Sequence, residues 1–224
     1  MLAEAITIRI GLLSLLLAAP SVPWAASLTL QVVSADGPVA DAVISLNAAE
    51  SALSEPHSDR ISVDQVGSEF VPRVTVVRVG TAVDFPNSDL TRHQVYSFSP
   101  AKRFSLPLYS GTPPAPVLFD QAGVVSLGCN IHDWMQGFIV VVNTPYFGKT
   151  DAEGRASLSA PAGSYRVQLW HERLLGDPSQ TMELVDGPSD EIRLEIELSA
   201  PPPPRGSDRL RALQNKLREQ GGKN

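Results

Sequence analysis

Short apolar runs separated by turn residues fill the chain from Ser27 to Ala200, and they restrict its fold more than any other feature. The runs are rich in Val, Ile, Leu, Tyr and Phe, and in "RLEIEL" (193–198) apolar and charged residues largely alternate, as in half-buried strands. The 19 prolines and 16 glycines supply many turns and argue against long helices. We therefore predict an all-β chain of the sandwich type.

Two stretches far apart in the chain resemble the two halves of one known module. The segments "VVSADGPVADAVISL" (32–46) and "TDAEGRASLSAPAGSYRVQLW" (150–170) are similar to the carboxypeptidase-regulatory or transthyretin-like β-sandwich, in which a variable excursion separates two signatures. Their "ADG" and "DAEG" supply turns that tolerate positive φ. The resemblance implies that residues 27–55 and 146–198 form this immunoglobulin-like sandwich, and that residues 60–145 are a second sandwich inserted into it.

The two ends of the chain differ from the middle in composition. Residues 1–26 contain Arg9, an apolar run up to Ala19 and then small residues and prolines, which resembles a secretory signal peptide. We expect export to the periplasm, and an uncleaved anchor is the alternative. Residues 199–224 contain four consecutive prolines and then leucines at helical spacing after Ser207. They predict a Pro-rich linker and a short helix, or else a frayed tail.

Charge and apolar length exclude some classes of partner. The net charge is −6, whereas nucleic-acid-binding proteins usually carry a basic surface, so nucleic acid is not expected to bind. A membrane span needs about 20 apolar residues, and no run in this chain reaches that length. The mature chain is therefore expected to have no membrane span. The oligomeric state has no signature in the sequence.

The only cysteine lies in "LGCNIHDWMQGFIVV" (127–141), followed at intervals of three residues by His132 and Met135. An unpaired cysteine in an exported protein calls for another role. Alternation along a strand would send Cys129 and His132 to opposite faces, so we expect a loop that turns these side chains toward one point. Thiolate, imidazole and thioether form a soft donor set that suits copper, especially with a second imidazole. The alternative is that all three are ordinary core or surface residues.

A second imidazole could come from three other histidines. His93 is the best candidate, because it follows a strand that ends near Phe85 and a polar turn, and it precedes another strand. His171 follows a strand of the transthyretin-like half and is expected on the surface, with a second metal contact or a domain interface as alternatives. His57 lies in a polar loop segment.

Residues 60–145 resemble the cupredoxins, which are blue-copper proteins with a Greek-key β-sandwich, such as plastocyanin, pseudoazurin and amicyanin. The upstream family pattern is matched by Gly80, Val83, Phe85, Asn87 and His93. The downstream pattern is matched by "FDQAGVVSLGCNIHDWMQGFIVV" (119–141), whose short C-x-x-H-x-x-M stretch is most similar to amicyanin.

This resemblance implies one type 1 copper ion per chain and assigns its ligands. The implied equatorial ligands are His93, Cys129 and His132, and the implied axial ligand is Met135. Asn87 matches a position whose side chain ties the two ligand loops together. The chain departs from the family at Gln94, where Asn is frequent, and at Arg92, where Pro is usual.

The remaining histidines and cysteines are too few for a second copper centre. A multicopper oxidase or copper nitrite reductase needs further histidines, and a binuclear purple centre needs two cysteines, so we expect one mononuclear site. A site filled by protein ligands favours a carrier of single electrons between protein redox partners over an enzyme. The rivals are a module for copper storage, delivery or sensing, and a metal-free structural or interaction protein.

The position of His132 in the stretch predicts that its ring edge is the exit for the electron. Ile131, Asp133 and Trp134 are then expected to form a docking surface, and Pro145 and Tyr146 are further candidates. The alternative for Trp134 is a core position.

Overall fold

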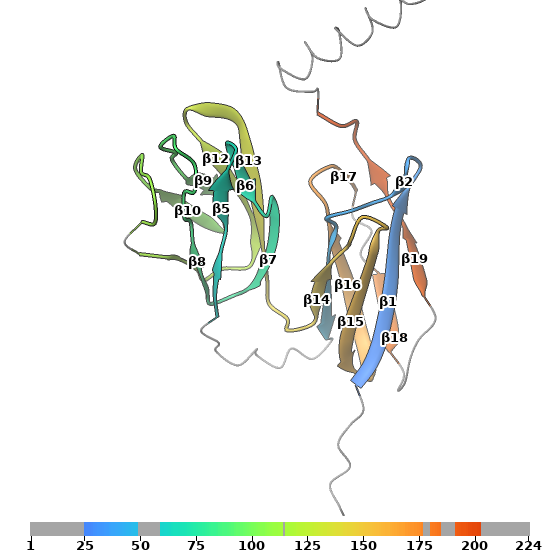
Figure 1. Cartoon of the computed structure of the whole chain (residues 1–224). Helices are drawn as coiled ribbons and strands as arrows, with labels where there is room; N and C mark the ends of the chain where they lie inside the picture. The colour runs from blue at the N-terminus through green and yellow to red at the C-terminus, as the bar shows by residue number, and fades with distance from the viewer. Residues whose placement is uncertain (1–24, 49–58, 114, 177–179, 185–190, 203–224) are drawn as a thin grey trace, which may run out of the picture.

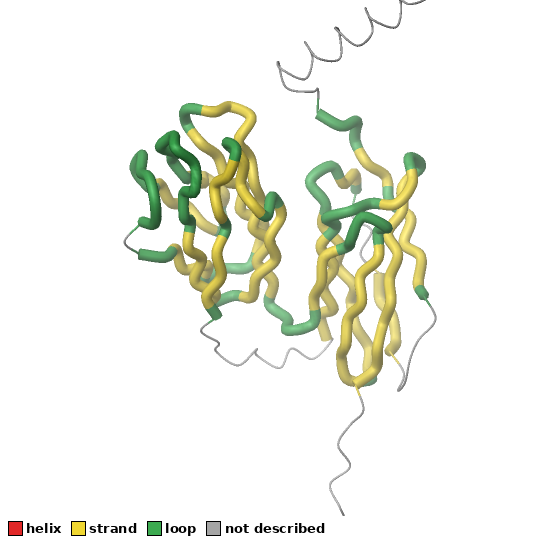
Figure 2. Tube along the Cα trace, in the orientation of Figure 1, coloured by secondary structure: helices red, strands yellow, loops and turns green. Residues whose placement is uncertain are grey.

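The computed structural model describes residues 25–48, 59–113, 115–176, 180–184 and 191–202 (Figure 1). Every element in these ranges is a strand (Figure 2), which confirms the predicted all-β class. The described ranges contain no helix that could cross a membrane. Almost all of the expected signal peptide, His57 and the expected C-terminal helix lie outside the described residues.

The first sandwich, here called the flanking sandwich, is built from strands on both sides of the middle segment. One sheet contains β1 (Ala25–Ser34), β2 (Gly37–Pro38), β15 (Arg155–Pro161) and β19 (Ile192–Glu195). The other contains β14 (Phe147–Lys149), β3 (Val43–Ala48), β16 (Gly163–Trp170) and β18 (Gln180–Leu184). A short pair is formed by β17 (Leu174–Leu175) and β20 (Glu197–Leu198). Strand β1 pairs with β15, and strand β3 pairs with β16. Strands from the two parts of the chain that resemble halves of one module therefore lie side by side in both sheets.

Alternation places the core of the flanking sandwich between its two sheets. In β15, Ala156, Leu158 and Ala160 are buried while their neighbours are exposed, as expected for a strand with one face on a core. The turn before β15 requires its glycine: Gly154 has a φ of +73°, and a Cβ there would lie 2.4 Å from the carbonyl oxygen of Val32. The "DAEG" segment is therefore a turn with positive φ, as the sequence indicated.

Residues 60–142 form the second sandwich, here called the inserted sandwich. Its larger sheet has the order β10 (Lys102–Ser105), β9 (Tyr96–Ser99), β12 (Gly123–Cys129), β13 (His132–Val142) and β7 (Val74–Arg78). Its smaller sheet contains β11 (Val117–Phe119), β8 (Thr81–Asp84) and β4 (Arg60–Ser62), and a separate hairpin is formed by β5 (Asp64–Val66) and β6 (Glu69–Val71). The core between the sheets includes Phe70, Phe85 and Ile139, and it also contains Cys129 and Met135.

The two sandwiches contact one another through a small apolar cluster of their own. Its buried members come from β3, β7 and β13, and Trp170 and Phe138 pack against it with ring centroids 5.3 Å apart. Beside the cluster, Arg73 forms a two-pronged ion pair with Glu172 and lies 5.3 Å from the centre of the Phe138 ring.

Candidate metal centre

The stretch around Cys129 is a tight hairpin rather than the expected loop. Strand β12 runs up to Cys129 and β13 begins at His132, so only Asn130 and Ile131 lie between them (Figure 1). Gly128 pairs with Gln136, but the next residue, Cys129, pairs with His132. This shift in register leaves three residues of β13 without a counterpart. Strict alternation would send Cys129 and His132 to opposite faces of the sheet. The bulge in the hairpin reorients the side chains on β13, so that these two can point to the same place.

The segment around His93 is held by backbone pairing with the segment around Tyr109. His93 and Tyr109 exchange two hydrogen bonds, of 3.1 Å and 3.0 Å, and Asn87 is paired in the same way with Gly111. These contacts place His93 inside the end of the sandwich, where its side chain has no exposed surface.

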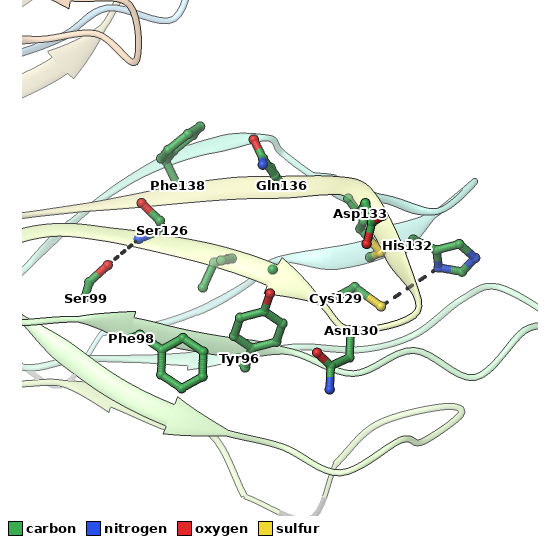
Figure 3. A pocket seen from close by; sticks show the side chains of 13 residues that line it. Tyr96, Phe98, Ser99, Ser126, Cys129, Asn130, His132, Asp133, Gln136 and Phe138 are labelled. Atoms are coloured by element: carbon green, nitrogen blue, oxygen red, sulfur yellow. Dashed lines mark hydrogen bonds between the residues drawn. The ribbon is translucent and has the colours of Figure 1, made fainter. Parts of the chain in front are cut away.

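Three donor atoms meet at the end of the inserted sandwich. The Sγ atom of Cys129 lies 4.0 Å from the Nδ1 of His93 and 3.9 Å from the Nδ1 of His132. All three atoms lie within 4.8 Å of one another. Figure 3 shows the side chains of Cys129 and His132 at the tip of the hairpin, with the contact between them as a dashed line.

These spacings fit a first-row metal ion. With bonds of about 2.0–2.1 Å to nitrogen and about 2.3 Å to sulfur, two ligands in one trigonal plane lie about 3.8 Å apart. The sulfur-to-nitrogen distances of 4.0 Å and 3.9 Å are close to this value. Two imidazoles and one thiolate in a plane are the donor set of a blue-copper site.

Met135 lies in the same core cluster as Cys129 and is 1% exposed. Both residues line a cavity of about 560 Å³ beside the hairpin. Regular alternation along β13 places Met135 on its inward face, together with the buried Gly137 and Ile139. This position is compatible with the axial role that the resemblance implies, and that role stays a prediction.

Asp89 is a residue of the site that the sequence analysis missed. Its Oδ2 lies 2.7 Å from the Nε2 of His93, on the side of the ring away from Cys129. The carboxylate also accepts hydrogen bonds from the backbone amides of Gly67 and Ser68. Desolvation raises the pKa of Asp89, but the hydrogen bonds from Ser68, Gly67 and His93 together outweigh it and lower the pKa below its usual value.

The side chain of Asn87 supports the loop that leads to His93. Its Nδ2 donates to the carbonyl oxygens of Thr91 and Tyr109, and its Oδ1 accepts from the amide of Asp89. Asn87 thus ties its own loop to the Tyr109 segment. Among the described residues, none of these side-chain bonds reaches the Cys129–Met135 stretch. At Gln94, one of the two departures from the family pattern, the side chain donates to the hydroxyl of Ser105.

Beneath these loops lies a partly buried polar network that was not predicted. Gln65 donates to Tyr109 at 2.6 Å, and the Tyr109 hydroxyl donates to the carbonyl of Phe85 at 2.5 Å. Burial raises the pKa of Tyr109 to about 12, so the hydroxyl stays protonated and can donate at neutral pH. The network therefore fixes the segment that pairs with His93.

The surface around His132 is apolar and exposed. Ile131 is 48% exposed and Trp134 is 50% exposed, and the Trp134 ring lies 5.1 Å from the His132 ring, so Trp134 is not a core residue. Asp133 is exposed beside them. Leu90 and Leu108, on the loops that flank His93, are also exposed and were not foreseen.

Two other residues of interest lie in or beside the flanking sandwich. Tyr146 packs on its core, with its ring 5.8 Å from that of Tyr165, so it does not belong to the surface around His132. His171 is half-buried and precedes Glu172, the partner of Arg73. Burial lowers the pKa of His171, as expected for a histidine near the contact between the sandwiches.

Comparison with known proteins gives structural neighbours only. No family model matches the chain, and no curated protein matches it. Among solved structures, a reduced proline-to-phenylalanine mutant of amicyanin is 26% identical and matches over 46% of this chain and 99% of its own, with a TM-score of 0.34. A purple cupredoxin from Nitrosopumilus maritimus is 22% identical over 38% of this chain and 99% of its own, with a TM-score of 0.33.

A third match is to a larger protein. The copper-containing nitrite reductase of Thermus scotoductus SA-01 is 27% identical over 38% of this chain, with a TM-score of 0.36. The match spans only 23% of the length of that reductase.

Proposed function

We propose that the inserted sandwich is a cupredoxin domain that holds one type 1 copper ion and carries single electrons between protein partners. The observation that carries this proposal is the meeting of two imidazole nitrogens and one thiolate sulfur at a hairpin tip, with sulfur-to-nitrogen distances of 4.0 Å and 3.9 Å. Export to the periplasm is part of the proposal and rests on residues 1–26. The proposal also includes the predicted domains, which are residues 27–55 with 146–198 and, inserted between them, residues 60–145.

Bound copper would supply one-electron chemistry by alternating between Cu(I) and Cu(II). The ligands His93, Cys129, His132 and Met135 would leave no position for a substrate, so we propose a carrier and not an enzyme. His93 and Cys129 are held in buried positions of a packed sandwich, which limits the movement of the donors when the charge of the site changes.

Among the two histidines, only His132 reaches the surface. His93 has no exposed surface, whereas His132 is half-buried and stands among the exposed side chains of Ile131, Asp133 and Trp134. We therefore place the exit for the electron at the edge of the His132 ring. A small apolar surface of this kind suits weak redox encounters, which bury little area.

The direct test is the addition of Cu(II) to the purified mature protein. We expect a single copper ion per chain, an intense blue colour from the thiolate–copper bond and a reversible one-electron wave in voltammetry. Cys129→Ser should abolish the blue colour, since it removes the sulfur donor, whereas His171→Gln should retain it as a control outside the site.

Other results would favour the other functions. Copper bound only as colourless Cu(I), without a reversible wave, would indicate storage, delivery or sensing. Equal copper content in the wild type and Cys129→Ser would contradict the ligand assignment. Absence of bound copper from the wild type would favour a metal-free structural role.

A further inference from the structure

We propose that Asp89, held by the β5–β6 turn, is a positioning residue that fixes the tautomer and orientation of His93 and thereby lowers the reduction potential of the copper site. The part that concerns the potential rests on the proposed function. The part that concerns the tautomer stands on the geometry of the chain alone.

The hydrogen-bond chemistry of Asp89 decides which nitrogen of His93 carries the proton. An ionised carboxylate can only accept hydrogen bonds, so the Nε2 atom, 2.7 Å from the Asp89 Oδ2, must be the one that is protonated. In the neutral ring, the form that can bind a metal ion, the Nδ1 atom then has a free lone pair, and this is the atom that faces the Cys129 sulfur at 4.0 Å. Because His93 is fully buried, no solvent water competes for Nε2.

The carboxylate of Asp89 is itself held in place by the turn between β5 and β6. Gly67 and Ser68 form this turn with φ values of +63° and +59°, the backbone of a two-residue type I′ hairpin connection. Their amides point at one side chain: Gly67 donates to Oδ1 at 2.7 Å and Ser68 to Oδ2 at 2.8 Å. Both oxygens are therefore held by backbone amides of one turn.

The backbone of Asp89 is restrained from the other side. Its amide donates to the Oδ1 of Asn87 at 3.0 Å. The preceding residue, Ser88, donates through its hydroxyl to the Oδ2 of Asp64 at 2.7 Å. The His93 ring thus depends on a chain of contacts that runs from the β5–β6 hairpin through Asp89. His132, by contrast, is half-exposed at the hairpin tip.

A negative charge hydrogen-bonded to a ligand imidazole makes that imidazole a stronger donor. It stabilises Cu(II) more than Cu(I), because the charge of the metal ion is larger. Replacing the carboxylate by a neutral amide should therefore raise the reduction potential. It should also weaken Cu(II) binding by about 10- to 100-fold, the usual effect of removing an outer partner of a metal ligand.

The test compares Asp89→Asn with Asp64→Asn. Both substitutions remove one negative charge from the same group of loops, but Asp64 contacts Ser88 and Gln65 and does not bond a histidine. We expect a clear rise in potential and a changed Cu(II) electron paramagnetic resonance spectrum for Asp89→Asn. For Asp64→Asn we expect a much smaller rise with an unchanged spectrum, because the asparagine oxygen can still accept the hydrogen bond from Ser88. Asp89→Glu should recover part of the wild-type potential.

A second measurement needs no copper. Nitrogen-15 NMR of the metal-free wild type at neutral pH should show His93 as the Nε2–H tautomer, and Asp89→Asn should show a mixture of tautomers. An Nδ1–H tautomer in the wild type would overturn the proposal even if Asp89→Asn failed to fold. Equal rises in potential for the two asparagine variants would overturn it as well. Failure of the wild type to turn blue would count against the proposed function and leave the tautomer result to be judged separately.

Discussion

His93 and His132 reach the same sulfur atom from opposite environments. His93 is enclosed and its outer nitrogen is taken by Asp89, whereas His132 is half-buried and one face of its ring lies near Trp134. The two imidazoles are therefore suited to different tasks at one metal ion: His93 fixes the geometry, and His132 offers contact with the outside.

At the residue scale, the role of Met135 can be separated from its packing. Met135→Leu keeps the apolar volume at a fully buried position, so the free energy of unfolding should change by less than about 1.5 kcal/mol. The variant should remain blue, but loss of the weak axial donor should raise the reduction potential, because the more highly charged Cu(II) loses more stabilisation than Cu(I) when a donor is removed. Chemical denaturation and voltammetry measure the two effects. An unchanged potential would mean that Met135 is a core residue only.

At the element scale, the β12–β13 hairpin shows what could be read from the sequence. The residue types and spacing of Cys129, His132 and Met135 predicted a donor set, and His93 could be chosen from its place before a strand. The register shift after Gly128 could not be predicted, because a bulge is decided by how β12 pairs with β13 and not by the spacing of residues within one strand.

Asp89 was missed for a related reason. In the sequence it is one polar residue in a polar turn, with nothing to separate it from Asp84 or Ser88. Its role depends on the amides of Gly67 and Ser68, which lie more than 20 positions upstream in another hairpin. Such a contact exists only once the β5–β6 hairpin has been placed beside the His93 segment.

A glycine in β13 tests how closely the β5–β6 hairpin approaches the larger sheet. A Cβ at Gly137 would lie 2.9 Å from the Cβ of Phe70, a buried residue of β6 that cannot move without its strand. Gly137→Ala should therefore lower the free energy of unfolding by about 1–3 kcal/mol in urea denaturation.

The matched control is Gly148→Ala in β14. There the nearest atom to the added Cβ, from Leu158, lies 3.7 Å away, which is an ordinary contact. This variant should be neutral or more stable by up to about 1 kcal/mol, since alanine restricts the unfolded chain. Equal losses of stability in the two variants would contradict the close approach of β6 to β13.

At the scale of the whole molecule, the apolar cluster and the Arg73–Glu172 ion pair beside it both join the two sandwiches. The cluster should contribute more to the free energy that holds the sandwiches together. Val140 is 6% exposed and lies in this cluster with Val43 of β3. Val140→Asp would place an unpaired charge there, at a cost of several kcal/mol. We expect the wild type to unfold in one calorimetric transition and Val140→Asp to unfold in two.

The ion pair provides the comparison. The Arg73 and Glu172 side chains are 42% and 20% exposed, and pairs with exposed partners contribute about 0.2–1 kcal/mol. Glu172→Gln should therefore unfold in one transition at nearly the wild-type temperature. Two transitions in Glu172→Gln, or one in Val140→Asp, would show that the ion pair contributes more than the apolar cluster.

The chain enters and leaves the inserted sandwich at almost the same point. The carbonyl of Val142 accepts from Val79, in the short β7–β8 connection, at 3.0 Å. The carbonyl of Asp59 accepts from Ala82, near the start of the adjoining β8, at 2.9 Å. The β12–β13 hairpin tip lies at the opposite end (Figure 1). Residues 59–142 could therefore be transplanted between two adjacent strands of an unrelated host without rerouting its backbone. The graft would present the hairpin tip away from the host. This orientation would suit electron transfer between the grafted protein and an electrode.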